Sequence, residues 1–123
     1  RFINLFDTSL PVVSKYVVEP GKQAFLFNID KVENPENPQV LAAAARLEEE
    51  TMDKNTYTVV MKSPKETTNV MRVLLPVKPS VVQVSDAEGN SMQEMEFTWD
   101  ETSKTCFLKF ENSPEGVRVR FVL

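Results

Sequence analysis

The sequence contains no histidine, so the commonest general base and the commonest metal ligand in proteins are both missing. It contains one cysteine, Cys106, which excludes a disulfide within the chain. Cys106 lies in an apolar run with Phe107 and Leu108, where a small buried hydrophobe is favoured over a reactive nucleophile. Phosphate-binding loops, dinucleotide fingerprints and zinc ligand sets do not occur in the sequence either. We therefore expect neither a metal nor a cofactor, and we do not expect this chain to be an enzyme.

No apolar run approaches the roughly 20 residues that a transmembrane helix needs, so we expect no membrane span in this chain. The basic residues are scattered, and 14 Lys and Arg against 18 Asp and Glu give a formal charge of −4. Such a chain has no positive field to attract phosphate backbones, and we expect no nucleic-acid partner. The first residue is Arg rather than Met, which indicates a mature or excised fragment with any signal peptide upstream.

What the sequence does contain is the composition of a globular protein, with 123 residues of which 41% are hydrophobic and 26% charged. A chain of this size buries roughly two-thirds of its unfolded surface, which suffices for a core without disulfides or metal. We expect one domain over residues 1–123. Two small units in tandem are the alternative, with a boundary near 31–39, where two Asn-Pro pairs interrupt the pattern.

The stretch 70–84 predicts the architecture, because two segments rich in Val and Leu flank Pro76 and Pro79. Each proline fixes φ at about −65° and lacks an N–H, so the chain must turn or cross over between the segments. We interpret 70–75 as a strand that ends one sheet and 80–84 as a strand that begins the next.

Alternating apolar and polar residues predict most of the remaining strands, and turn-forming residues separate them. The clearest inward faces belong to 92–99, 105–110 and 117–123. This pattern is typical of an antiparallel sandwich. The sequence therefore predicts an all-β fold, an immunoglobulin-like or jelly-roll-like antiparallel β-sandwich with at most one short helix near 38–50.

Two strand pairings follow from turn chemistry. Strands 11–19 and 23–30 are expected to pair around Pro20-Gly21, and strands 80–85 and 92–99 around a turn at 86–90.

Charges on the outer faces predict one further contact. Arg118 and Arg120 in the last strand are expected to face Glu94 and Glu96 across the sheet, with solvated surface charge as the alternative.

Residues 38–50 carry conflicting signals. Asn37-Pro38 is a good helix start, and the alanine-rich segment after it has the highest helix propensity in the chain. The glutamates at 48–50 oppose the dipole of such a helix at its C-terminal end, and the small residues also alternate as in a strand. Helix and strand both remain open for this segment.

Candidate sites for chemistry are few. Glu94 and Glu96 lie on one face of their strand, as the paired carboxylates of a glycosidase must, but alternating charges are ordinary on an exposed hairpin. The turn 86–90 is rich in oxygen atoms, yet it lacks the further ligands that a calcium loop needs.

Aromatic rings that could stack on sugars are the remaining candidates, and they are Tyr16, Tyr57 and Trp99. Trp99 continues an inward face, so packing in the core is its alternative role. Tyr16 lies nearest to a turn and is the ring most expected to be exposed.

Three segments of the chain resemble the C-terminal β-sandwich region of secreted glycoside-hydrolase-like proteins of gut Bacteroidetes. They are LFDTSLPVVSKYVVEPGKQAFLFNID at 5–30, TTNVMRVLLPVKPSVVQV at 67–84 and FTWDETSKTCFLKFENSPEGVRVRF at 97–121. The shared motifs are turns and alternations, and no catalytic residue is among them. The resemblance implies a periplasmic or cell-surface protein and an accessory role beside a catalytic domain of the same polypeptide. It also adds weight to an extended conformation over 40–47.

We therefore expect a non-catalytic structural module of a carbohydrate-active protein, whose partner is the neighbouring catalytic domain. One alternative is a carbohydrate-binding module, for which the partner is a glycan. Another is a protein-interaction domain of a surface assembly for glycan utilisation.

Overall fold

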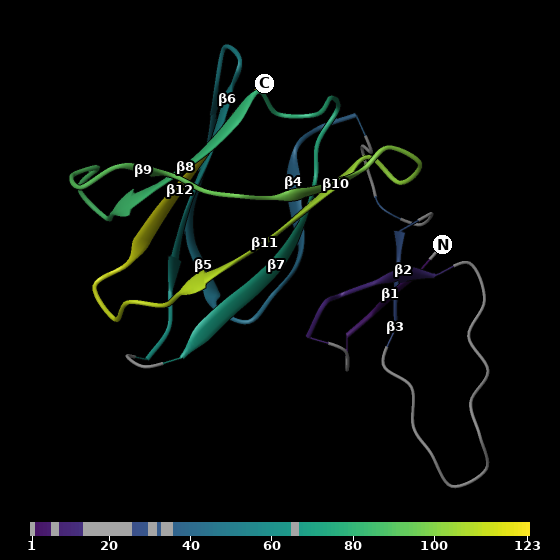
Figure 1. Ribbon diagram of the computed structural model, residues 1–123, viewed down its shortest axis with the longest axis horizontal. Coiled ribbons are helices and arrows are strands. Elements are labelled where there is room, and N and C mark those ends of the chain that lie inside the picture. Colours follow the sequence, from purple (N-terminus) through teal and green to yellow (C-terminus); the bar gives the residue numbers. More distant parts are fainter. Residues whose placement is uncertain (1, 6–7, 14–25, 30–31, 33–35, 65–66) are drawn as a thin grey trace, which may run out of the picture.

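The computed structural model describes residues 2–5, 8–13, 26–29, 32, 36–64 and 67–123. These residues form twelve strands in three sheets (Figure 1). The strands are β1 (Phe2–Asn4), β2 (Val12–Val13), β3 (Leu26–Asn28), β4 (Gln39–Ala43), β5 (Arg46–Asp53), β6 (Thr56–Lys62), β7 (Thr68–Leu74), β8 (Val81–Asp86), β9 (Gln93–Glu94), β10 (Thr98–Asp100), β11 (Thr105–Glu111) and β12 (Val117–Val122).

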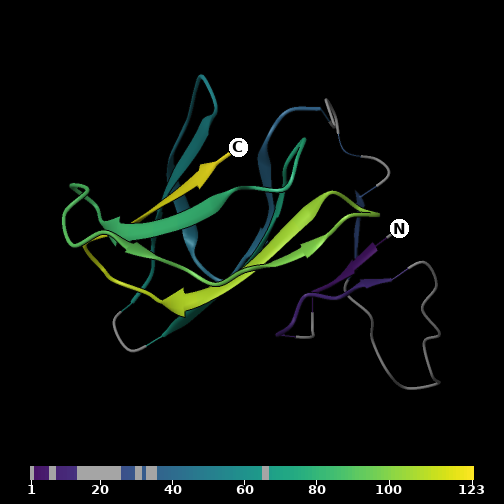
Figure 2. The ribbon, with the colours of Figure 1, turned by 45° about the horizontal axis from the view of Figure 1, so that its top comes forward.

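Two of the sheets form a sandwich, and a third packs outside it (Figure 2). Sheet B has the order β10-β11-β7-β4 and sheet C the order β5-β6-β12-β8-β9, while the small sheet A has the order β2-β1-β3. Every pair of neighbouring strands is antiparallel. The predicted all-β antiparallel sandwich is therefore confirmed.

The strand order corresponds to that of the immunoglobulin fold, whose sheets have the orders A-B-E-D and C-F-G. The strands β4, β7, β11 and β10 take the places of A, B, E and D, and β8 and β12 take those of C and F. The place of G, beside β12, is taken by β6. That strand comes from the β5–β6 hairpin, which is inserted in the chain between β4 and β7.

The corner at 76–79 joins the two layers of the sandwich as predicted, because β7 belongs to sheet B and β8 to sheet C. Backbone hydrogen bonds anchor both of its ends. The Leu75 N–H donates to the Lys104 carbonyl at 3.0 Å, and the Ser80 N–H donates to the Val122 carbonyl at 2.7 Å.

The main core lies between sheets B and C. The inward faces predicted for 105–110 and 117–123 are confirmed by the burial of their alternate side chains. Met95, Phe97 and Trp99 are partly buried and pack against the same core. The buried members of the core are Tyr57, Val59, Met61, Met71, Val73, Leu75, Val82, Cys106, Leu108, Phe110, Val117, Val119 and Phe121.

Sheet A packs on the outer face of sheet B through a second apolar cluster. Its buried members are Ile3, Leu10, Ile29, Leu41 and Leu74. Arg72, an outward-facing residue on β7, stabilises this contact and is only 7% exposed. Its Nε donates a hydrogen bond to the Leu10 carbonyl at 2.6 Å, and its Nη1 donates one to Thr105 Oγ1 at 3.0 Å. Its guanidinium carbon also lies 5.5 Å from the ring centre of Phe107, within the range of a cation–π contact.

The segment 38–50 is extended, as β4 and β5 with a bend at 44–45 between them. Pairing of β4 with β7 and burial of Leu41 between sheets A and B outweigh the helix propensity of the alanine run. The helix that was one of two alternatives for this segment therefore does not form.

Of the two pairings predicted from turn chemistry, one is wrong and the other is confirmed in part. Strands β2 and β3, within the predicted segments 11–19 and 23–30, do not pair with each other, because β1 lies between them. The turn expected at Pro20-Gly21 lies outside the described residues. The pairing of 80–85 with 92–99 is confirmed for β8 and β9, which are joined through two residue pairs in sheet C. The remainder of 92–99 then leaves this sheet, and β10 joins sheet B. Met95, Phe97 and Trp99 still face the core as predicted, because sheets B and C share one core.

The predicted contact of Arg118 and Arg120 with Glu94 and Glu96 is wrong for a topological reason. Strand β8 lies between β12 and β9, so the arginines neighbour β8 and β6 instead. The domain boundary considered near 31–39 falls partly outside the described residues, which leave out 31 and 33–35.

Candidate functional site: a polar groove on sheet C

The three aromatic candidates for sugar contact are placed differently. Tyr57 is 1% exposed, with its ring in the core 5.8 Å from that of Phe121, so it offers no face to a sugar. Trp99 is half-buried against the core, and its Nε1–H donates to Glu101 Oε2 at 2.7 Å. Tyr16 lies outside the described residues.

The other candidate groups have structural roles or stand apart. The carboxylate of Asp86 accepts hydrogen bonds from the backbone N–H groups of Glu88 and Asn90 at 3.1 and 2.8 Å, so it caps its own turn. Glu94 and Glu96 are exposed beside an open depression of about 600 Å³ at the side of the sandwich. No group of three or more His, Cys, Asp or Glu side chains suited to a metal ion occurs in the described part of the chain.

Cys106 is fully buried on the inner face of β11. Burial raises the pKa of its thiol to about 12, because the charged thiolate would lose its hydration inside the core. The thiol therefore stays protonated near neutral pH and acts as a small core side chain, in agreement with the prediction.

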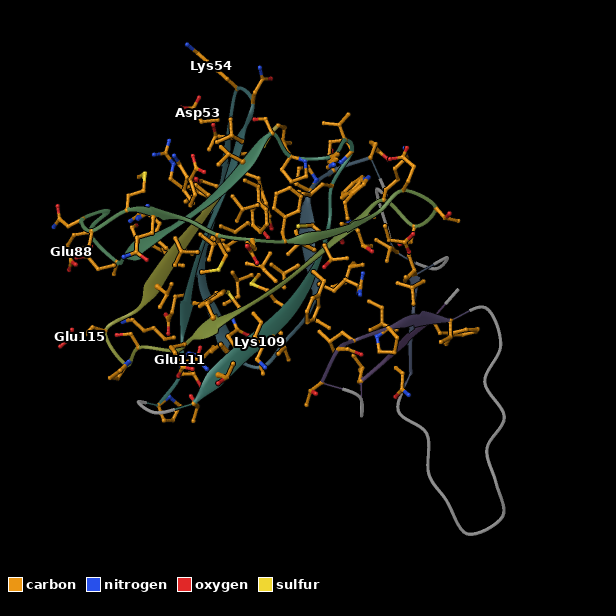
Figure 3. The ribbon with its side chains drawn as sticks, viewed as in Figure 1. Asp53, Lys54, Glu88, Lys109, Glu111 and Glu115 are labelled. Carbon is orange, nitrogen blue, oxygen red and sulfur yellow. The ribbon has the colours of Figure 1, made fainter. Side chains whose placement is uncertain are left out.

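A groove of about 470 Å³ crosses the outer face of sheet C, and we call it the sheet C groove. Strands β5, β6 and β12 and the β8–β9 turn line it. Figure 3 labels Asp53, from the β5–β6 hairpin, and Glu88, from the β8–β9 turn, the acidic side chains on its two flanks. The lining residues are Thr51, Asp53, Thr56, Thr58, Glu88, Gly89, Met92, Arg118 and Arg120.

The floor of the groove belongs to a continuous polar row across the sheet. Strand register places five outward-facing residues opposite one another on successive strands. From β5 to β9 they are Thr51, Thr58, Arg120, Gln83 and Glu94. With neighbouring strands about 4.8 Å apart, the row is roughly 19 Å long. It offers hydroxyl, guanidinium, amide and carboxylate groups in that sequence.

The β8–β9 turn forms one wall, and Arg118 holds it in place. Its Nε and Nη2 both donate to the Ala87 carbonyl, at 3.0 and 2.7 Å. Gly116 lies against this wall too, because a Cβ there would be only 3.1 Å from the Ala87 Cβ. The wall is therefore fixed by side-chain and packing contacts as well as by the Asp86 cap.

Arg120 differs from Arg118 because its guanidinium has no hydrogen-bond or ion-pair partner among the residues that the structure describes. It is half-buried in the middle of the sheet, between Thr58 on β6 and Gln83 on β8. A planar guanidinium with free N–H groups can bind a carboxylate through two parallel hydrogen bonds.

The sequence indicated which of these side chains face outward, but not that they meet. The outward positions of Thr56, Thr58, Arg118 and Arg120 follow from strand alternation. Their convergence depends on β6 lying beside β12, and no local signal predicts that neighbour.

No family model, no curated protein and no solved structure matches the chain. No helix among the described residues has the length and apolar character that crossing a membrane requires.

Proposed function

We propose that this chain is a non-catalytic accessory module of a carbohydrate-active protein of the periplasm or cell surface, attached to a catalytic domain of the same polypeptide. The observation that supports the proposal best is the docking of sheet A on sheet B. The strands β1 to β3, which precede the sandwich in the chain, are fastened to it by the second apolar cluster and by Arg72.

The packing of sheet A on the sandwich affects how a neighbouring domain is oriented. A flexible linker leaves the orientation of the domain behind it free, whereas a packed segment fixes it. The module would then present the sandwich, and with it the sheet C groove, at a defined angle to the neighbouring domain.

The test is to tag the protein at its chromosomal locus, recover the intact polypeptide and measure its mass, its cell fraction and its activity on glycans. Cross-linking through the exposed Lys54, Lys78 and Lys109 would then map the contacts of the module. We expect a longer polypeptide in the periplasmic or surface fraction, with cross-links to a glycan-cleaving domain. A cytoplasmic polypeptide with no such domain would contradict the proposal.

Carbohydrate binding by the chain itself is a second candidate function, and the sheet C groove favours it. Its hydroxyl, carboxylate and guanidinium groups complement a polyhydroxylated ligand, and Met92 adds an apolar contact at the wall. The volume of the groove, about 470 Å³, lies within the range of about 300–1,000 Å³ typical of ligand sites.

A further inference from the structure

We propose that the sheet C groove binds an acidic oligosaccharide and that Arg120 receives the carboxylate of a uronic acid residue. This inference deepens the second candidate function and rests on it for the class of ligand. The position of the site and the charge of the ligand follow from the lining of the groove alone.

Arg120 is the groove's available cation. The guanidinium of Arg118 is engaged by the Ala87 carbonyl, whereas Arg120 is unpaired within the described residues. Arg120 lies on β12, which is hydrogen-bonded to β6 on one side and to β8 on the other. The backbone that carries the guanidinium is therefore held rigidly by the sheet. A bidentate pair with a carboxylate is the strongest interaction open to such a group.

The neighbours of Arg120 suit the rest of a sugar ring. Thr58 and Gln83 flank it in register, and Thr51 continues the row on β5. Of these side chains, Thr58 and Thr51 line the groove and can exchange hydrogen bonds with ring hydroxyls beside the carboxylate. Met92, 41% exposed at the wall, can cover an apolar C–H face of the ring.

The acidic side chains on the two flanks determine where in the groove the charged sugar of the ligand lies. Asp53 and Glu88 repel a carboxylate placed beside them and accept hydrogen bonds from hydroxyl groups. An acidic sugar is therefore directed to the middle of the groove, and its neutral hydroxyls toward the flanks.

The test uses the chain itself and matched pairs of ligands. The probes are oligomers of galacturonic, glucuronic and mannuronic acid, each compared with its methyl-esterified form, which keeps the sugar and removes the charge. Calorimetry gives the affinity, and NMR shift mapping locates the ligand. We expect at least one acid oligomer to bind and to shift the resonances of Thr58 and Arg120. Its ester should bind at least about tenfold more weakly, since a charge-assisted hydrogen bond is lost.

Variants separate recognition from folding. Arg120→Ala should abolish the preference for the acid, and Arg120→Lys should restore only part of it, because an ammonium cannot bind bidentately. Arg46→Ala is the matched control, since it removes the same charge from the exposed side of β5 outside the groove and should leave binding unchanged. Asp53→Asn should tighten binding of the acid and not of the ester, an effect that a purely structural role would not produce.

The inference is overturned if none of the acid oligomers binds, if acid and ester bind equally, or if a folded Arg120→Ala protein binds as the wild type does. Failure here is distinguishable from failure of the accessory-module proposal. The latter is decided by the mass, location and activity of the native polypeptide, whatever the isolated chain binds.

Discussion

Arg72 and Leu10, 62 positions apart in the sequence, are joined by a 2.6 Å hydrogen bond from the Arg72 Nε to the Leu10 carbonyl oxygen. Leu10 has a positive φ of 44°, a conformation that branched or bulky side chains seldom adopt. The leucine is nevertheless buried, with 5% of its surface exposed. The bond to Arg72 and the burial of the side chain therefore stabilise a backbone conformation that would be unfavourable alone.

Replacing Arg72 should loosen sheet A from the sandwich. Arg72→Met keeps an apolar side chain beside Phe107 and leaves the Leu10 carbonyl and the Thr105 hydroxyl without their donor. We expect a loss of about 2–4 kcal/mol in the free energy of unfolding, measured with urea. Arg46→Met, at an exposed position, should change it by less than about 0.5 kcal/mol. Equal stability of the two variants would show that the Arg72 contacts contribute nothing.

The hydroxyl and the ring of Tyr57 should be separable. The hydroxyl donates to Glu50 Oε2 at 2.6 Å near the surface, while the ring packs in the core. Tyr57→Phe should cost about 0.5–1.5 kcal/mol, and Tyr57→Ala about 3–5 kcal/mol, because the second change also leaves a cavity. Urea unfolding of both variants checks this order. A Phe variant as unstable as the Ala variant would contradict it.

Stability should decline at alkaline pH. Burial raises the pKa of Cys106 from 9.0 to about 12, so the folded chain holds this proton more tightly than the unfolded chain does. The contribution of this proton to the free energy of unfolding is complete below pH 9.0 and is lost as the pH rises toward 12. Burial also raises the pKa of Tyr57 above its ordinary value of 10.0, which adds a further loss above that pH.

The slope of the unfolding free energy should therefore approach about 1.4 kcal/mol per pH unit for the thiol alone. Urea unfolding at a series of pH values from neutral upward measures it. Cys106→Ala should remove the part of the decline that begins near pH 9.0, since no thiol remains to ionise. An unfolding free energy that stays constant up to pH 10.0 in the wild type would count against this account.

The two glycines with positive φ should respond differently to alanine. Gly89 has a φ of 91° and open space around its Cα, whereas Gly116 has a φ of 106° and would place a Cβ 3.1 Å from the Ala87 Cβ and 3.3 Å from Val60 Cγ1. Gly89→Ala should cost about 1–2 kcal/mol from backbone strain alone. Gly116→Ala should cost more, because crowding adds to the same strain. Thermal and urea unfolding of the pair would refute this if Gly89→Ala were the worse of the two.

The sequence predicted inward faces better than strand neighbours. The alternation of Cys106, Leu108 and Phe110 places these side chains in the core whichever strands lie alongside. The same alternation runs through Met95, Phe97 and Trp99 while the chain leaves one sheet for the other. Alternation records which side of the backbone is buried, and it contains no information on which sheet supplies the hydrogen bonds.

Local propensity left the prediction undecided between helix and strand only at 38–50, where tertiary pairing opposed it. Ala42 and Ala43 are good helix formers, but β4 pairs with β7 and buries Leu41 beneath sheet A. The sheet C groove was hidden for a related reason. Thr58 and Arg120 become neighbours only because a hairpin inserted early in the chain occupies the place beside the last strand.

That arrangement governs the order in which the chain can assemble during synthesis. Strand β12 leaves the ribosome after every other strand of the sandwich described above, yet it is the middle strand of sheet C and joins β6 to β8. Until residue 122 has emerged, β6 and β8 have no common partner, and one layer of the sandwich stays open with its apolar surface uncovered. Nascent chains halted before β12 should therefore be captured by chaperones, and the sandwich should fold only after β12 has been translated.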